Sequence, residues 1–206
     1  SAFSRPVASV MILAAIVANT RRRVAERRVA RPFAELHARL ADAPPVRSLH
    51  DAPGKGFGVI AEHKRRSPSG GPSDPANLRA AYSTYADTSW IVAVSVLTDE
   101  DYFDGKLDDL AVARERVKKP VLRKDCIVDE YQVVEARAFA ADAILLMASV
   151  LVEEPETLRR LYQLARSLDL DVLVELCRAN RGIEELVRVI PPEARIWGIN
   201  ARQFAS

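Results

Sequence analysis

The chain has 206 residues, of which 49% are hydrophobic and 28% are charged, and its formal net charge at pH 7 is +2. This length allows one large domain or two small ones with a sizeable core. The small net charge excludes the strongly basic overall charge that is typical of nucleic-acid-binding domains. Two cysteines, Cys126 and Cys177, are too few for a disulfide framework and indicate a reducing compartment, so we expect a cytoplasmic protein.

Two helices are predicted at the start of the chain, near residues 9–29 and 31–42, and residues 1–8 are expected to be a tag or a flexible end. The apolar stretch at 11–17 is far too short to span a bilayer and fits an amphipathic helix, so no membrane partner is expected. Six arginines follow at positions 21–31. They form either a solvated helix face, which we favour, or a site for a phosphate or another anion.

A loop rich in proline and glycine at 43–56 precedes a regular alternation of strands and helices. Six short runs rich in Val, Ile or Leu are typical of parallel strands buried on both faces. Their centres lie roughly 22 to 33 residues apart, which is the length of a βα unit. The strands centre on Ile60, Ala93, Leu122, Leu145, Leu173 and Ile196, and the helices between them lie near 76–86, 107–118, 129–139, 155–167 and 181–190.

Two α/β architectures fit this alternation: an open doubly wound sheet and a (β/α)₈ TIM barrel. No Gly-x-Gly-x-x-Gly follows the first strand, which weakens the dinucleotide-binding version of the open sheet. Polar residues end several different strands, which favours the barrel. We therefore expect a single barrel domain in residues 1–206, with N-terminal helices at 9–50, βα units one to six at 57–206, and units seven and eight not in the sequence.

Charged and polar side chains lie at the carboxyl ends of four of the predicted strands. Alternation along each strand places Glu62, Lys64, Lys124, Glu175 and Asn200 on the faces that point to the barrel axis, around one mouth. Two carboxylates and two ammonium groups could hold each other charged and serve as acids and bases. A purely structural network of salt bridges is the alternative.

Several motifs, in order along the chain from about residue 10 to the end, resemble the indole-3-glycerol phosphate synthase family of tryptophan biosynthesis. Each motif alone would be weak, but the set is highly specific. The motifs are Ile60-Ala-Glu-x-Lys-x-x-Ser-Pro-Ser, Ser95-Val-Leu-Thr-Asp-Glu, Tyr102-Phe103-x-Gly105, Pro120-Val-Leu-Arg-Lys-Asp, Tyr131-Gln with Glu135-Ala-Arg, Ala141-Asp-Ala-Ile-Leu-Leu, Val172-Leu-Val-Glu and Gly198-Ile-Asn-x-Arg.

The resemblance implies a carboxy-lyase that closes the indole ring of 1-(2-carboxyphenylamino)-1-deoxyribulose 5-phosphate with loss of carbon dioxide and water. It implies that Lys124 is the general acid that protonates the substrate carbonyl as the aromatic carbon attacks. Glu175 matches the carboxylate that assists later proton transfer and dehydration, and Glu62 matches the residue that orients the substrate chain and the lysines.

The resemblance also implies the residues that bind the substrate. Lys64 and Ser67 match positions that handle its anionic groups, Phe103 matches part of an aromatic wall, and Asn200 and Arg202 match polar contacts. The implied partner is this small phosphorylated molecule, with no nucleic acid, no metal and no organic cofactor.

The chain departs from the family at several positions. Cys126 stands where the family usually has Phe, and Ala140 lies in a turn before a strand where the family often has Gly, so that turn is expected to be strained or differently built. Six open strands would also expose two edges, so we expect either self-association or a partner segment that completes the barrel. A non-catalytic barrel fragment or interaction scaffold is the alternative function, and another phosphate-handling barrel enzyme is a weaker one.

Four residues near the predicted site are expected to have structural roles. Arg123 and Asp125 flank Lys124 but point away from the axis, as partners behind the site or on the helix side. His63 and Trp197 also fall on the helix-facing side of their strands, and Trp197 is expected to pack in the core.

Overall fold

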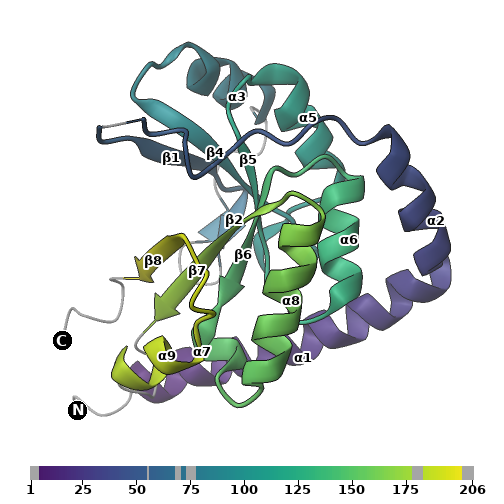
Figure 1. Cartoon of the computed structure of the whole chain (residues 1–206), viewed down its shortest axis with the longest axis vertical. Helices are drawn as coiled ribbons and strands as arrows, with labels where there is room; N and C mark the ends of the chain where they lie inside the picture. Colours follow the sequence, from purple (N-terminus) through teal and green to yellow (C-terminus); the bar gives the residue numbers. More distant parts are fainter. Residues whose placement is uncertain (1–4, 55, 68–70, 73–77, 178–182, 201–206) are drawn as a thin grey trace.

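A curled parallel sheet, whose strands follow one another in chain order, is the centre of the fold (Figure 1). The computed structural model describes residues 5–54, 56–67, 71–72, 78–177 and 183–200. All six predicted strands are confirmed. They are β1 (Val59–His63), β4 (Ile91–Leu97), β5 (Val121–Lys124), β6 (Ala143–Met147), β7 (Asp171–Cys177) and β8 (Ile196–Asn200).

Helices follow the strands and cover the outer side of the sheet, as expected for successive βα units (Figure 1). The sequence pattern missed four elements that hold too few residues to show a periodicity: α4 (Glu100–Phe103), α7 (Ala148–Leu151), β2 (Arg66–Ser67) and β3 (Gly71–Pro72). The helices are α1 (Arg5–Ala30), α2 (Phe33–Arg39), the 3₁₀ turn η1 (Leu40–Asp42), α3 (Leu78–Asp87), α4 (Glu100–Phe103), α5 (Asp108–Arg116), α6 (Glu130–Ala138), α7 (Ala148–Leu151), α8 (Pro155–Ser167) and α9 (Ile183–Val189). A two-stranded antiparallel ribbon joins β2 (Arg66–Ser67) to β3 (Gly71–Pro72).

The two faces of the strands pack into two separate apolar clusters, as the alternation predicts. The outer cluster packs the sheet against the helices and is the larger one. The inner cluster lies on the side of the barrel axis, where Leu49 of the preceding loop fills the bottom. Its strand residues are Ala93, Leu122, Ala143, Leu173 and Ile196.

The parallel topology and the two-layer packing are those of a (β/α)₈ barrel, of which the described part of the chain contains six strands. Within the described residues, β1 pairs only with β4 and β8 pairs only with β7, so each of these strands presents one unpaired edge. The expectation that Trp197 packs in the core is wrong, because it lies on the edge strand β8 and is 49% exposed. Ile199, on the same face of β8, is 67% exposed.

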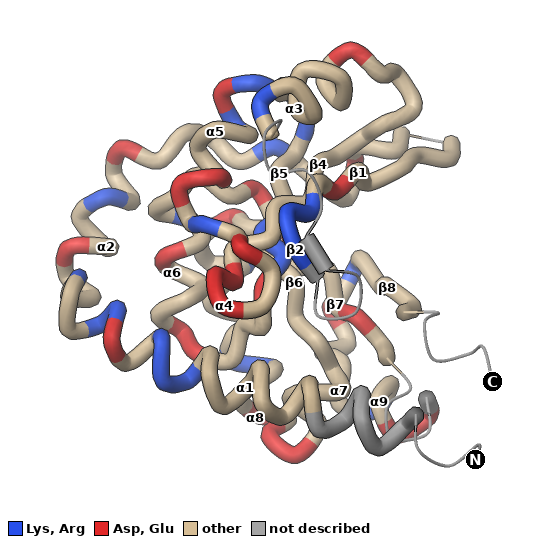
Figure 2. Tube along the Cα trace, turned by 180° about the vertical axis from the view of Figure 1, so that it is seen from behind, with Lys and Arg blue, Asp and Glu red and all other residues tan. Residues whose placement is uncertain are grey.

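The helix α1 crosses the end of the sheet toward which the strands point, along the bottom of the view in Figure 1. Its arginines remain largely exposed, as expected for a solvated face, but they form no open anion site, because most of them also pair with carboxylates of the barrel. Figure 2 shows the basic turns of α1 and the acidic turn at α4 as blue and red segments. The pairs are Arg21–Glu154, Arg23–Glu100, Arg23–Asp101, Arg27–Glu135 and Arg28–Asp129.

None of the described helices combines the length and the apolar character that crossing a membrane requires.

Candidate active site

The carboxylate of Glu62 lies between two lysines at the carboxyl ends of β1 and β5. Its Oε1 is 3.4 Å from Nζ of Lys64, and its Oε2 is 3.7 Å from Nζ of Lys124. Ser95, the register partner of Glu62 on β4, donates a hydrogen bond from Oγ to Oε2 at 2.8 Å. The three charged side chains are only partly exposed, at 23% to 32%, so their mutual attraction is less screened than on an open surface.

An apolar pocket of about 130 Å³ lies beside Lys124. The helix α1 contributes Leu13 and Ile16 to it, and Phe103 contributes an aromatic wall. Nζ of Lys64 stands 5.9 Å from the centroid of the Phe103 ring, within range of a cation–π interaction. Apolar cavities of about 150 Å³ bind benzene, so a pocket of this kind can receive an aromatic ring next to an ammonium group. The remaining lining residues are Leu97, Asp99, Asp125, Cys126, Leu145 and Met147.

The position of Phe103 depends on a tight turn after β4. The side chain of Asp99 caps α4 by accepting a hydrogen bond from the amide of Tyr102 at 2.6 Å. The helix ends at Asp104 in the left-handed region, with φ 54°, and the amide of Gly105 donates to the carbonyl of Asp99 at 2.8 Å. A Cβ on Gly105 would lie 2.2 Å from the carbonyl oxygen of Leu97, so only glycine allows this turn to close.

A second polar pair, Glu175 on β7 and Asn200 on β8, lies on the same inner face. Nδ2 of Asn200 is 3.4 Å from Oε1 of Glu175, and Gly198, the register partner of Glu175, has no side chain to separate them. Ser67 lies in β2, but its side chain is outside the described part of the structure, and Arg202 lies outside the described residues. Among the described side chains, no group of three or more His, Cys, Asp or Glu residues is arranged to hold a metal ion.

The thiol of Cys126 forms part of the pocket wall and is 4% exposed. Burial, reinforced by the negative charge of Asp125, raises the pKa of this thiol to about 12. A thiol with this pKa is neutral at physiological pH and is a poor nucleophile. Cys126 therefore serves as a small apolar wall residue.

The prediction that Arg123 points away from the axis is confirmed, and Asp125 pairs with it while also contributing to the wall of the pocket beside Lys124. Arg123 is completely buried between the sheet and α6, where it meets Asp125 and Glu135. Burial alone would lower the pKa of Arg123, but these two carboxylates more than offset it and raise the pKa above its ordinary value. Sequence reasoning missed Ser95, Leu13 and Ile16 as neighbours of the site. A hydroxyl inside an otherwise apolar strand was the one available signal, and it pointed to Ser95.

A parallel barrel with paired lysines and carboxylates at the carboxyl ends of its strands defines the class of (β/α) barrel proteins equipped for acid–base chemistry on a small anionic molecule. The family model described as indole-3-glycerol phosphate synthase matches residues 13–206. The chain belongs to the indole-3-glycerol phosphate synthase family.

Individual relatives agree with this assignment. The chain is 43% identical to an indole-3-glycerol phosphate synthase of Nocardioides, over 94% of this chain and 72% of the relative. It is 45% identical to indole-3-glycerol phosphate synthase 2 of Streptomyces coelicolor, over 94% of this chain and 73% of the relative. It is 40% identical to the enzyme of Neisseria meningitidis, over 94% of this chain and 74% of the relative.

Proposed function

We propose that this protein is an indole-3-glycerol phosphate synthase, a carboxy-lyase of tryptophan biosynthesis. The substrate is 1-(2-carboxyphenylamino)-1-deoxyribulose 5-phosphate. One carbon–carbon bond forms between the aromatic ring and the ribulose carbonyl carbon, the ring carboxylate leaves as carbon dioxide, and the former carbonyl oxygen leaves as water. The observation that carries the proposal is the Lys64–Glu62–Lys124 cluster beside an apolar pocket of ring size.

Lys124 is the general acid of the ring closure in this proposal. Its ammonium group stands at the rim of the apolar pocket, where it can protonate the substrate carbonyl while the ring carbon attacks. Glu62 holds both lysines by charge and is itself fixed by Ser95, so the ammonium groups keep a defined position. Lys64 is then placed to bind the ring carboxylate before it leaves as carbon dioxide.

The second half of the reaction is a dehydration, which we assign to Glu175 with Asn200 beside it. The carboxylate of Glu175 can accept the proton from the carbon next to the one that bears the hydroxyl and pass it to that hydroxyl, which leaves as water, and the amide of Asn200 keeps the carboxylate oriented. Phe103 contacts the substrate ring, and Ser67 and Arg202 bind its anionic and hydroxyl groups in this proposal. These assignments rest on the match of each residue to the family motifs.

The decisive experiment measures indole-3-glycerol phosphate formation by its indole fluorescence. Lys124→Ala is expected to abolish turnover, while the matched control Lys118→Ala is expected to leave it unchanged, because Lys118 is exposed before the start of the same strand. Equal turnover in the Lys124→Ala variant and the parent would refute the acid role. A parent protein that binds the substrate but never turns it over would instead support a non-catalytic scaffold.

We also propose that further polypeptide covers the two open edges of the sheet, either a second copy or a segment that completes the barrel. Edge backbone of β1 and β8 that has no strand partner in the described part of the chain, together with the exposed side chains of Ile60, Trp197 and Ile199, favours such pairing. Light scattering of the purified protein at several concentrations separates the two, since only self-association depends on concentration. The free thiols of Cys126 and Cys177 support a cytoplasmic location.

A further inference from the structure

A chain of buried charges lies directly behind Lys124, on the opposite side of β5 from the pocket. Arg123 is fully buried, and its Nη2 is 2.7 Å from Oδ2 of Asp125 and 2.9 Å from Oε2 of Glu135 on α6. Its Nε donates to Oγ1 of Thr98 at 3.0 Å, and its Nη1 donates to the carbonyl of Gln132 at 2.9 Å. These contacts favour one arrangement of Arg123, because losing a carboxylate would weaken the compensation of a buried charge and losing Thr98 or Gln132 would leave a buried N–H group unpaired.

The same network fixes the backbone that follows Lys124. Oδ1 of Asp125 accepts a hydrogen bond from the amide of Cys126 at 2.8 Å. The side chain of Gln132 donates to the carbonyl of Cys126 and accepts from the amide of Val128, both at 2.9 Å. The end of β5, from which Lys124 extends, is therefore tied to α6 by side chains rather than by strand pairing alone.

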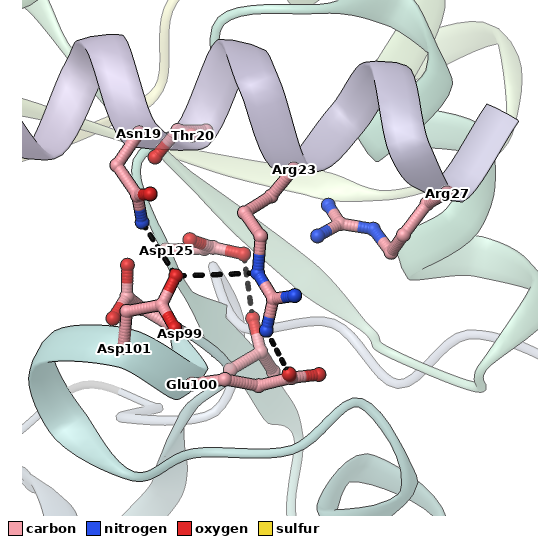
Figure 3. Close-up of a pocket in the computed structure, with 9 residues that line it drawn as sticks. Asn19, Thr20, Arg23, Arg27, Asp99, Glu100, Asp101 and Asp125 are labelled. Atoms are coloured by element: carbon pink, nitrogen blue, oxygen red, sulfur yellow. Dashed lines mark hydrogen bonds and ion pairs between the residues drawn. The ribbon is translucent and has the colours of Figure 1, made fainter.

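The network continues outward to α1, the helix that lines the pocket. Nε of Arg27 donates to Oε1 of Glu135 at 2.9 Å, while the other oxygen of Glu135 makes the ion pair with Arg123 without a hydrogen bond of its own. Figure 3 shows Arg27 and Arg23 on α1 above Asp125 and the acidic turn at Asp99, Glu100 and Asp101. One carboxylate thus connects the helix over the mouth to the strand that carries Lys124.

We propose that Glu135 is a positioning residue for Lys124, because it couples the seating of α1 to the end of β5 through Arg27 and Arg123. The proposal rests on the proposed function only for the role of Lys124. With Arg27 in place, cations hold both oxygens of Glu135. Arg123 and Asp125 then fix the end of β5, so that Lys124 keeps its position at the mouth of the barrel. Without Arg27, Glu135 is free to shift on the side of α1, and the strand end loosens with it.

The test uses a matched pair of variants on the same helix. Arg27→Met removes the link to Glu135, and Arg28→Met removes an ion pair with Asp129 that joins α1 to the same region without reaching Arg123. We expect Arg27→Met to lower kcat by about tenfold with little change in KM, because small displacements of a catalytic group act on the chemical step. Arg28→Met should stay within about twofold of the parent. Arg27→Lys should restore part of the loss.

A second measurement does not depend on turnover. Hydrogen–deuterium exchange of the segment 122–128, in the absence of substrate, should be faster by about fivefold or more in Arg27→Met and unchanged in Arg28→Met, since amide exchange reports local opening. Equal exchange and equal kcat in the two variants would overturn the proposal. So would a loss in Arg27→Met that appears only in KM. Faster exchange in Arg27→Met in a protein that lacks synthase activity would refute the proposed function but support the coupling of α1 to the end of β5.

Discussion

The turn that follows α6 predicts an unusual effect of a glycine substitution. The helix ends in a Schellman arrangement, in which the amide of Ala141 donates to the carbonyl of Ala136 and the amide of Ala140 donates to the carbonyl of Arg137, both at 3.0 Å. This arrangement needs a left-handed residue at Ala140, whose φ is 64°. Replacing this alanine by glycine should therefore stabilise the protein, whereas glycine usually destabilises.

Two opposing contributions set the size of the effect. An alanine in the left-handed region costs about 1–2 kcal/mol relative to a relaxed conformation, and glycine removes this strain. Glycine also gains about 0.4–1 kcal/mol of conformational entropy in the unfolded chain, which acts against folding. The net stabilisation for Ala140→Gly is about 0.5–1 kcal/mol. In a domain of this size it corresponds to a rise in Tm of roughly 1–4 °C.

Thermal and urea unfolding followed by circular dichroism measure this difference. The matched control is Ala141→Gly, one residue further along, where the backbone has ordinary φ and the methyl group is buried at 1% exposure. That variant should lose about 1–2 kcal/mol, from the lost methyl burial and the added unfolded-state entropy. If Ala140→Gly destabilised the protein as much as the control does, the strain argument would be refuted.

Three further predictions concern the site. Gly105→Ala should lower kcat/KM by about tenfold or more in the fluorescence assay, because its Cβ would clash with the carbonyl of Leu97 and displace the turn that carries Phe103. Cys126→Ser should retain activity within about threefold. A thiol reagent at pH 8 should modify Cys126 only after unfolding, because burial raises the pKa of this thiol to about 12. Rapid inactivation of the folded parent through Cys126 would contradict this. Burial also raises the pKa of Asp99, so the folded state binds this proton more tightly than the unfolded state does. The charged carboxylate therefore lowers the stability of the fold as the pH rises from the unfolded pKa, and the loss is complete above the folded pKa. Asp99→Asn should accordingly be more stable than the parent at pH 7 by urea denaturation, with an advantage that shrinks toward pH 4; a constant difference would point to another cause.

The sequence was most informative where burial repeats in a simple pattern. All six strands were predicted because each is an apolar run between polar segments, and alternation within the strands brought Glu62 and Lys124 to one mouth. Most helix ends were predicted to within a few residues, as for α8, which begins at Pro155 as the missing amide of proline suggests. The expected flexible end over residues 1–8 is wrong for its second half, because α1 already begins at Arg5. These features depend on neighbours a few positions apart, which a single sequence displays directly.

The features that escaped prediction depend on residues far apart in the chain. Arg23 pairs with Glu100 across 77 positions, and Arg21 pairs with Glu154 across 133, so the sequence showed an exposed basic face but not the carboxylates that pair with it. The pocket wall formed by Leu13 and the bond from Ser95 to Glu62 have the same origin. Trp197 was misplaced for a related reason, because the pattern of a strand does not say whether it lies at the edge of the sheet.

The way α1 is fastened has a consequence for how this sequence can diverge. Most of its ion pairs, such as Arg21–Glu154 and Arg28–Asp129, are well exposed, and an exposed pair contributes about 0–1 kcal/mol. Such pairs can be lost and regained one at a time, so substitutions at these positions are tolerated during evolution. The contact of Arg27 with the fully buried Glu135 has no such freedom. Among related sequences, substitutions along α1 should therefore be frequent at Arg21 and Arg28 and rare at Arg27.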